Sequence, residues 1–368
     1  MSRDKFNPAR LSLARRRRGF GKTELAAAIG VAADTIRRYE LGISVPDEKV
    51  KLIANALNFP EMFFFGGSID EPRRDNASFR GMASKTGKVM DAALGSGAIA
   101  FLLDDWISNQ FERSGSNLPD LQGERPEMAA MLVRQHWGLG EKPIKNMVHL
   151  LEANGIRVFS LAESNKDVDA FSLWRDEVPY VFLNRYKSAE RSRFDACHEL
   201  AHLCIHKHGG AGSTKQNSEI EKEANLFAAA FLMPATDVKT ICGTHIYGVD
   251  SLLDYKKRWG VSVAALNYRL SELGLISEGK ATSNYVELSR RGWLKTEPYG
   301  LAREQSVILQ DVVDDLLKLG ITKSKIATEL NVPPSEIEAL LFGLANMVSI
   351  DGFGGKTAPS RVSLKVIK

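Results

Sequence analysis

The sequence is poor in cysteine and has no long apolar run. Only three of its 368 residues are cysteine, at Cys197, Cys204 and Cys242, and no two of them form a Cys-x-x-Cys pair. This excludes a disulfide scaffold and a cysteine-rich zinc module, and it suits a reducing cytoplasm. The longest compact apolar run, from Ala98 to Leu103, is far shorter than the roughly 18 residues of a membrane helix, so no membrane partner is expected.

Length and charge indicate several domains with different partners. With 44% hydrophobic and 26% charged side chains, the composition is that of a globular protein, and the chain is too long for one average domain. The net charge of +4 is unevenly distributed: residues 1–40 carry ten Lys/Arg against four Asp/Glu, while the other 328 residues carry a net charge of −2. A positive excess confined to one end predicts a polyanionic partner for that end alone.

Short helical segments separated by glycine occupy the basic end. The apolar pattern predicts a first helix after Arg10, a second closing at Gly30, a third closing at Gly42 and a fourth beginning at Asp47. The turn over 30–32 has helix-turn-helix spacing, because glycine can adopt the left-handed conformation that turns the chain sharply. The residues expected in the core are Leu25, Ile29, Val31, Ile36 and Leu52.

This stretch resembles the Xre-type, lambda-repressor-like helix-turn-helix family across about 55 residues. The positions that carry the resemblance are the segment Thr23–Val31 and then Ile36, Glu40, Gly42 and Pro46. The resemblance implies that the third helix lies in the major groove of double-stranded DNA, with base contacts from its first turns. The side chains expected to face DNA are those of Lys22, Ala33, Asp34, Arg37 and Arg38.

The basic run from Arg15 to Arg18 has two interpretations. A charge run on its own is more often a solvated helix face, but beside a helix-turn-helix pattern we expect it to contact DNA phosphates. The apolar segment over 62–65 should close the small domain, and the composition of 66–74 predicts a linker.

A mixed pattern of helices and strands occupies the middle of the chain. Residues 76–155 have mostly helical patterns, and three short segments rich in β-forming residues follow at 156–161, 170–174 and 180–183. A helix that begins near Ala189 comes next and carries the most informative motif of the sequence.

That motif is His198-Glu199-x-x-His202. On a helix it puts two imidazoles one turn apart on the same face, where they can bind one metal ion, and the glutamate can reach metal-bound water. His206 falls on the same side, whereas the two cysteines of this helix fall on its back and are expected to be core residues. The motif alone is a weak signal, since a helix with exposed or core-satisfied histidines can also carry it.

A second helical segment supplies carboxylates. It begins near Glu219, ends before Pro234, and is expected to lie antiparallel to the motif helix. Two histidines plus one carboxylate leave a fourth position for water, which is the arrangement of catalytic rather than structural zinc.

The ordered blocks resemble the ImmA/IrrE zinc metallopeptidase family between about Met147 and Leu275. The blocks are Asn184, Arg191-x-Arg193-Phe194, His198-Glu199-x-x-His202 with trailing His206, and Glu221-x-x-Ala224-Asn225-x-Phe227 through Met233-Pro234. Members of this family are commonly fused to Xre-type domains, and some cleave an Xre-type repressor. The resemblance implies His198, His202 and Glu221 as ligands of Zn²⁺ and Glu199 as general base.

Glu219 and Glu223 compete with Glu221 for the third ligand position. The spacing from Glu221 to Asn225 matches that of zincins whose third ligand comes from a following helix, so Glu221 is favoured and Asn225 would orient a ligand. His206 is a less favoured ligand, because three ligands from one helix strain tetrahedral geometry. By the general zincin plan, the strand over 169–174 could pair with substrate along its edge.

The last part of the chain contains a weak internal repeat. The segment 325–332 repeats the apolar and turn spacing of the first helix-turn-helix, but Glu336 stands where Thr35 stands there, which disfavours approach to phosphate. Residues 285–368 are expected to form a small accessory domain, in which the chain after Gly355 is a strand or a loose end.

The sequence therefore predicts a mostly helical α+β protein with three parts. An all-α helix-turn-helix domain spans residues 8–66 and an accessory helical domain spans 285–368. Between them lies a zincin-like domain with a small sheet, over 76–280, with its core at 147–275.

The predicted function is that of a cytoplasmic, DNA-binding transcriptional regulator that is also a zinc metalloendopeptidase. The expected partners are double-stranded DNA, a protein substrate such as an Xre-type repressor or another regulatory protein, and a second copy of the chain. The alternative is a non-catalytic repressor or antitoxin-like binder that uses the peptidase fold as a sensor or dimerisation body.

Overall fold

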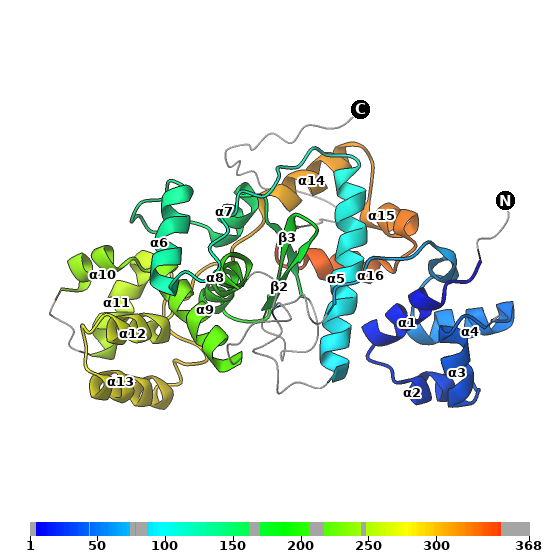
Figure 1. Ribbon diagram of the computed structural model, residues 1–368, viewed down its shortest axis with the longest axis horizontal. Coiled ribbons are helices and arrows are strands. Elements are labelled where there is room, and N and C mark those ends of the chain that lie inside the picture. The colour runs from blue at the N-terminus through cyan, green and yellow to red at the C-terminus, as the bar shows by residue number, and fades with distance from the viewer. Residues whose placement is uncertain are drawn as a thin grey trace.

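The computed structural model describes residues 5–43, 45–73, 78, 87–161, 170–206, 217–243 and 248–346. Within those ranges it contains sixteen α-helices and one three-stranded sheet, which confirms the mostly helical α+β class. The first four helices lie at one end of the molecule and the helices between residues 235 and 290 at the other, with the sheet between them (Figure 1). None of the described helices has the length and apolarity that a bilayer crossing requires.

The first domain packs four short helices around one apolar core. They are α1 (Pro8–Arg17), α2 (Lys22–Ala28), α3 (Ala33–Glu40) and α4 (Asp47–Leu57), followed by a 3₁₀ helix, η1 (Glu61–Phe65). The Asn7 side chain accepts a hydrogen bond from Ala9 N and caps α1. Gly30 turns the chain between α2 and α3 with a φ of +66°, the conformation that the helix-turn-helix spacing requires.

The core of this domain differs from the expected one at two positions. Leu25, Ile29 and Ile36 are buried, as predicted. Val31 is only half-buried at the turn. The prediction for Leu52 was wrong: its side chain is 42% exposed, because the apolar stripe of α4 that faces the core lies on the other side of the helix.

The middle of the molecule is built on a small mixed sheet. Its elements are α5 (Gly87–Ser108), α6 (Pro126–His136), α7 (Met147–Ala153), β1 (Arg157–Ser160), β2 (Ala170–Arg175) and β3 (Val178–Leu183). The strand order is β1-β3-β2, with β1 parallel and β2 antiparallel to β3. All three predicted strand segments are therefore confirmed, and β2 is an edge strand of this sheet. The position of Asp169, expected in the same strand, lies outside the described residues.

The two faces of the sheet contact different helices. Phe171 and Phe182 are register partners, and their rings stack with centroids 4.4 Å apart on the side of Gly97 in α5. Because side chains alternate along a strand, Ser172 points to the opposite face. There it meets Glu199 of α8 (Ala189–Ile205).

The remaining helices of the middle part are α9 (Asn217–Leu232), α10 (Ala235–Cys242), α11 (Val249–Trp259), α12 (Val263–Glu272) and α13 (Glu278–Arg290). The α8 helix begins at a Ser188 cap, whose side chain accepts from Arg191 N. The buried Arg269 of α12 connects this helical end to the rest: it donates to the Met233 carbonyl at 2.9 Å and forms two hydrogen bonds with Glu127 of α6.

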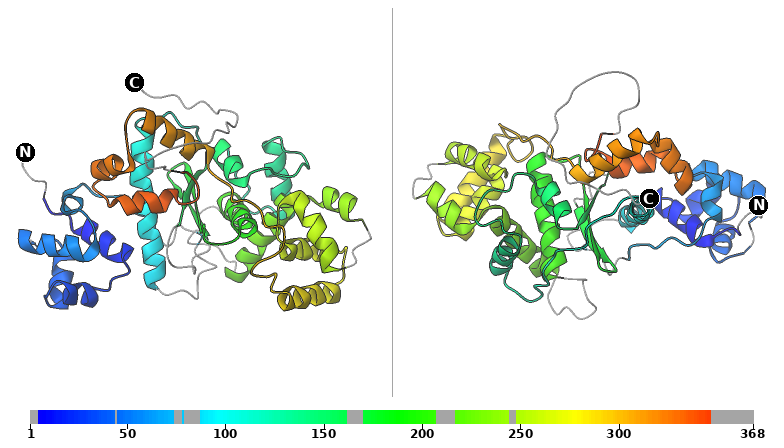
Figure 2. Two further views of the ribbon diagram at one scale, coloured as in Figure 1. Left: turned by 180° about the vertical axis from the view of Figure 1, so that it is seen from behind. Right: turned by 90° about the horizontal axis from the view of Figure 1, so that it is seen from above.

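The C-terminal helices repeat the helix-turn-helix arrangement but pack inward. They are α14 (Val307–Lys318), α15 (Lys323–Leu330) and α16 (Pro334–Leu341), and they lie beside α5 and reach the first domain (Figure 2). Asn331 turns the chain between α15 and α16 with a φ of +55°, where the first domain uses glycine. Trp106 of α5 donates to Glu329 of α15 at 2.8 Å. The expected strand or loose end after Gly355 lies outside the described residues.

The basic run of α1 is turned toward the protein, which contradicts the predicted phosphate contacts. Arg15 pairs with Glu40 of the same domain, and Arg16 pairs with Glu71. The other two arginines, at 17 and 18, both pair with Glu336 of α16, whose side chain is only 2% exposed. The acidic residue that was expected to repel phosphate is therefore a counter-ion for two arginines of the first domain.

Replacing Glu336 by Gln should destabilise the fold, because Arg17 would keep its charge in a site where its side chain is only 6% exposed. Breaking a buried pair from one side costs about 3 kcal/mol, which a denaturant titration can measure. The matched control is Glu338→Gln, since the Glu338 side chain is 50% exposed and pairs with Lys323 at the surface, where a loss below about 1 kcal/mol is expected. Equal losses in the two variants would contradict a buried pair.

Candidate functional site

Helices α8 and α9 bring two imidazoles and one carboxylate together. One ligand atom from each of His198, His202 and Glu221 lies within 4.8 Å of the others. The Nε2 atoms of the two histidines are 3.1 Å apart. The Glu221 carboxylate lies 3.3 Å from His198 Nε2 through one oxygen and 3.7 Å from His202 Nε2 through the other. The sequence motif and the following helix thus converge on one point.

The spacing of these atoms suits a tetrahedral metal ion. Ligands at about 2.0–2.1 Å from zinc are separated by about 3.3 Å along the edge of a regular tetrahedron, close to the observed separations. The Glu221 Oε1 atom is buried and accepts no hydrogen bond from the protein. A buried carboxylate oxygen without a donor is costly, and a bound cation would compensate it. The three residues therefore fit Zn²⁺ by both donor chemistry and geometry.

Neighbouring side chains fix which ring nitrogens face the site. His198 Nδ1 lies 3.0 Å from Asn225 Oδ1, so a protonated Nδ1 donates there and leaves the Nε2 lone pair for a metal. His202 Nδ1 lies 3.1 Å from His206 Nδ1, and the second nitrogen of His206 lies 2.9 Å from the Glu223 carboxylate. This geometry gives Asn225 and His206 supporting positions, each behind one of the two histidines.

The structure places the three glutamates of α9 that could supply a third metal ligand in different environments. Glu223 pairs with His206, Glu219 is exposed, and Glu221 is the one that lies against both motif histidines. One further expectation for this site is confirmed: Cys197 and Cys204 are fully buried, and burial raises the pKa of both thiols.

Glu199 lies beneath the same site and binds two serine hydroxyls. Its Oε2 accepts hydrogen bonds from Ser172 Oγ at 2.7 Å and from Ser78 Oγ at 2.5 Å. Burial raises the pKa of Glu199 to about 7, although His198 and the two serines act in the opposite direction. A carboxylate with a pKa near neutrality is suited to accept and return a proton.

Sequence reasoning missed both serines. Ser172 gave a signal that could have been used, because it is the polar residue of the predicted strand segment 170–174; in the structure it is 2% exposed. Ser78 gave none, since it lies 121 residues from Glu199 in the sequence.

The residues expected to face DNA all lie on the surface of the first domain. Lys22, Ala33, Asp34, Arg37 and Arg38 are exposed. Arg37 and Asp34 pair with each other across one turn of α3, at 3.0 Å, and Lys22 lies 3.1 Å from Glu40. The arrangement leaves the outer face of α3 open to a ligand, in contrast to the inward-turned arginines of α1.

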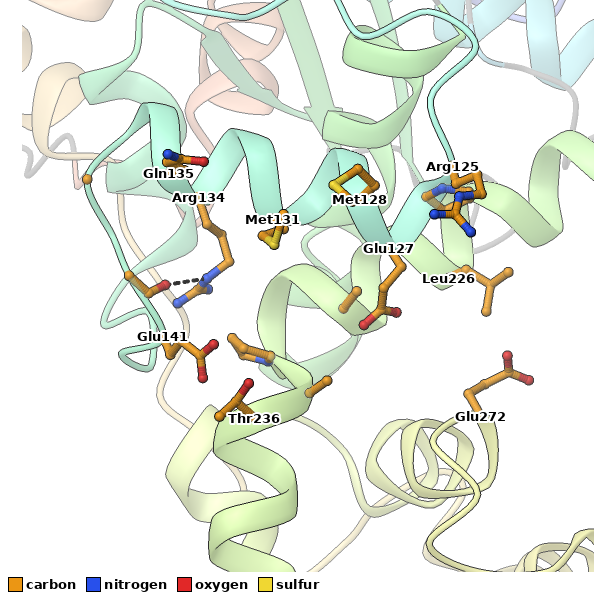
Figure 3. A pocket seen from close by; sticks show the side chains of 16 residues that line it. Arg125, Glu127, Met128, Met131, Arg134, Gln135, Glu141, Leu226, Thr236 and Glu272 are labelled. Atoms are coloured by element: carbon orange, nitrogen blue, oxygen red, sulfur yellow. Dashed lines mark hydrogen bonds between the residues drawn. The ribbon is translucent and has the colours of Figure 1, made fainter.

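A separate cavity of about 820 Å³ lies among α6, α9 and α10 (Figure 3). Its wall includes Met128, Met131 and Leu226, and Arg134, which donates to the Gly140 carbonyl at 2.8 Å. None of the three candidate metal ligands lines it, so this cavity is distinct from the α8–α9 site.

Two protein-family models match the chain. Residues 11–64 match a helix-turn-helix family, and residues 151–271 match the peptidase M78 family, described as an IrrE N-terminal-like domain. No curated protein matches the chain. The matches confirm the predicted fusion of an Xre-like helix-turn-helix domain with a domain of the ImmA/IrrE type.

Removing the Asn225 side chain should weaken metal binding. In Asn225→Ala, His198 loses the acceptor that orients its ring, and loss of such a partner lowers metal affinity about 10–100-fold. A zinc titration against a competing chelator measures the change. Lys222→Ala is the control on the exposed side of the same helix and should leave the affinity unchanged. Parallel behaviour of the two variants would refute the supporting role of Asn225.

Proposed function

We propose that the chain is a DNA-binding transcriptional regulator with zinc-dependent endopeptidase activity, and that its substrate is a repressor or another regulatory protein. The carrying observation is the convergence of His198, His202 and Glu221 beside the buried Glu199. A purely structural zinc site has no use for that fourth group, whereas hydrolysis requires a base. The two family matches support the pairing of DNA binding with a peptidase.

In this proposal Lys22, Ala33, Asp34, Arg37 and Arg38 contact double-stranded DNA. Domains of this type read two half-sites, so a second copy of the chain is a proposed partner. We propose the boundaries 8–66, 76–280 and 285–368 for the three domains. The proposed compartment is the cytoplasm, where the three unpaired cysteines would stay reduced.

The proposed mechanism gives each group one task. His198, His202 and Glu221 would hold Zn²⁺, which supplies Lewis acidity to the scissile carbonyl and the attacking water. Glu199 would take the proton of that water and deliver it to the leaving amine. Ser172, at 2.7 Å, would keep the accepting oxygen of Glu199 in position. Asn225 and His206 would hold the two imidazoles in the tautomers that leave Nε2 for the metal.

Glu199→Gln should abolish cleavage while the metal stays bound, because the amide cannot accept the proton. Loss of a general base lowers the rate by about 10²–10⁴-fold. The assay incubates zinc-loaded protein with Xre-type repressors encoded near its gene and measures bound zinc in the same samples. Glu219→Gln is the matched control on the exposed start of α9 and should cleave like the wild type.

Two outcomes would overturn parts of the proposal. Freshly purified protein without stoichiometric metal would contradict the metallopeptidase. Retained zinc with identical regulation by wild type and Glu199→Gln would favour the non-catalytic repressor or antitoxin-like binder.

Arg37→Ala should weaken operator binding and make it less dependent on salt. The Arg37 side chain is 61% exposed on the outer face of α3, and removing one phosphate contact reduces the salt slope by about 1. Arg290→Ala removes a charge that is 73% exposed from α13, at the opposite end of the molecule, and serves as the control. Binding is measured over a range of salt concentrations. If Arg37→Ala bound like the wild type at low salt, the assigned contact would be wrong.

A further inference from the structure

Ser78 occupies the open edge of β2. Its backbone N–H donates to the Ser172 carbonyl at 3.0 Å, and the Ser172 N–H donates to Ser78 Oγ at 2.8 Å. On its other side, β2 pairs with β3, in a register that places Ser172 opposite Val181. Ser78 therefore uses both backbone groups that Ser172 presents to an incoming strand, as an added peptide does in strand addition.

The same residue also reaches the proposed base. Ser78 Oγ donates to Glu199 Oε2 at 2.5 Å, the oxygen that also accepts from Ser172. A substrate peptide on this edge would need the backbone groups of Ser172 that Ser78 uses, and a water activated by Glu199 Oε2 would compete with the Ser78 hydroxyl for that oxygen. Ser78 therefore binds both the edge of β2 and the carboxylate of Glu199.

Two residues that precede Ser78 in the sequence contact β2 and α5. Asp70 pairs with Arg175, at the far end of β2, at 2.9 Å. Pro72 packs so closely on α5 that a Cβ added at Gly97 would lie 2.8 Å from its ring. Asp70 and Pro72 therefore lie against the same strand and helix that flank the contacts of Ser78 and Phe171.

On the basis of the proposed function, we propose that Ser78 is a built-in inhibitor of the peptidase that takes the place of substrate on the β2 edge. Ser78 meets Glu199 with a side-chain hydroxyl, so the base hydrogen-bonds to a group that is not a scissile peptide or an attacking water. Cleavage of another protein requires Ser78 to leave the β2 edge first. Ser78 belongs to the connecting segment between the first domain and α5 in the sequence, so its departure from the β2 edge would link DNA binding to cleavage.

The first test measures the contact itself in the full-length, metal-free protein. Ser78→Ala removes the acceptor of the Ser172 N–H, and Ser78→Pro removes the donor to the Ser172 carbonyl. Amide hydrogen exchange at Ser172 should become at least about tenfold faster in Ser78→Ala. Ser68→Ala, at an exposed serine earlier in the connecting segment, should leave it unchanged. Unchanged exchange at Ser172 in Ser78→Ala would overturn the proposal.

The second test measures cleavage in trans with zinc-loaded protein and a library of tryptic peptides from a cell lysate, analysed by mass spectrometry. Both Ser78 variants should cleave about tenfold faster than wild type and Ser68→Ala, the factor expected when a hydrogen bond to a charged group is lost. The increase should vanish when Glu199→Gln is added.

The outcomes separate the inhibitor from the peptidase. Equal rates in wild type and Ser78 variants, all above the Glu199→Gln background, would overturn the inhibitor and leave the proposed function standing. Rates at that background in every variant would overturn both. Scission of the wild-type chain beside Ser78 would show a substrate in place of an inhibitor and would also overturn the proposal.

Discussion

Burial of ionisable side chains between α8 and α9 is the constraint on which the rest of the site depends. The two helices bring together the imidazoles of His198 and His202 and the carboxylates of Glu199 and Glu221, and Glu199 and His202 are almost fully buried. Charges removed from water need partners, and here each partner also fixes an orientation. Asn225 and His206 satisfy the outer ring nitrogens, and Ser172 satisfies the base. The Glu221 Oε1 atom, to which no protein group donates a hydrogen bond, then marks the position where a bound cation would compensate the buried negative charge.

The same rule acts at the junction of the domains, with a different result. The four consecutive arginines at the end of α1 would repel one another without counter-ions. Two of them pair with separate carboxylates, Glu40 and Glu71, and the other two share Glu336. The +6 charge of the first 40 residues is therefore partly neutralised within the molecule. The side chains of the proposed DNA surface, which include Arg37, Arg38 and Lys22, are exposed on α3 and at the start of α2. A positive net charge identified the domain that binds a polyanion, but not the surface that does so.

A contact could be predicted from the sequence when its residues are close together in the chain, and could not be predicted when they are far apart. Helix periodicity fixes the positions of His198 and His202 on one face, so the motif was readable without a structure. The preference for Glu221 among three glutamates came from its spacing to Asn225, which matches that of zincins whose third ligand lies on a following helix. Glu336 and Ser78 could not be found in this way, because their partners lie 318 and 121 residues away and local periodicity carries no information about such pairs. The prediction for Leu52 was wrong for a different reason: an apolar side chain does not by itself show that a residue lies on the face of α4 that packs against the core.

Three residues between the first domain and α5 contact different parts of the molecule. Glu71 pairs with Arg16 of the first domain, Asp70 pairs with Arg175 of the sheet, and Ser78 donates to Glu199. If the proposed peptidase requires Ser78 to leave, a substrate that captures the β2 edge also displaces a residue of the segment that connects the two domains in the sequence. Coupling of two binding equilibria is reciprocal, so any state of the first domain on DNA that pulls on this segment must change substrate affinity by the same factor by which substrate changes DNA affinity. The fusion of the two domains then has a physical function beyond placing them in one chain.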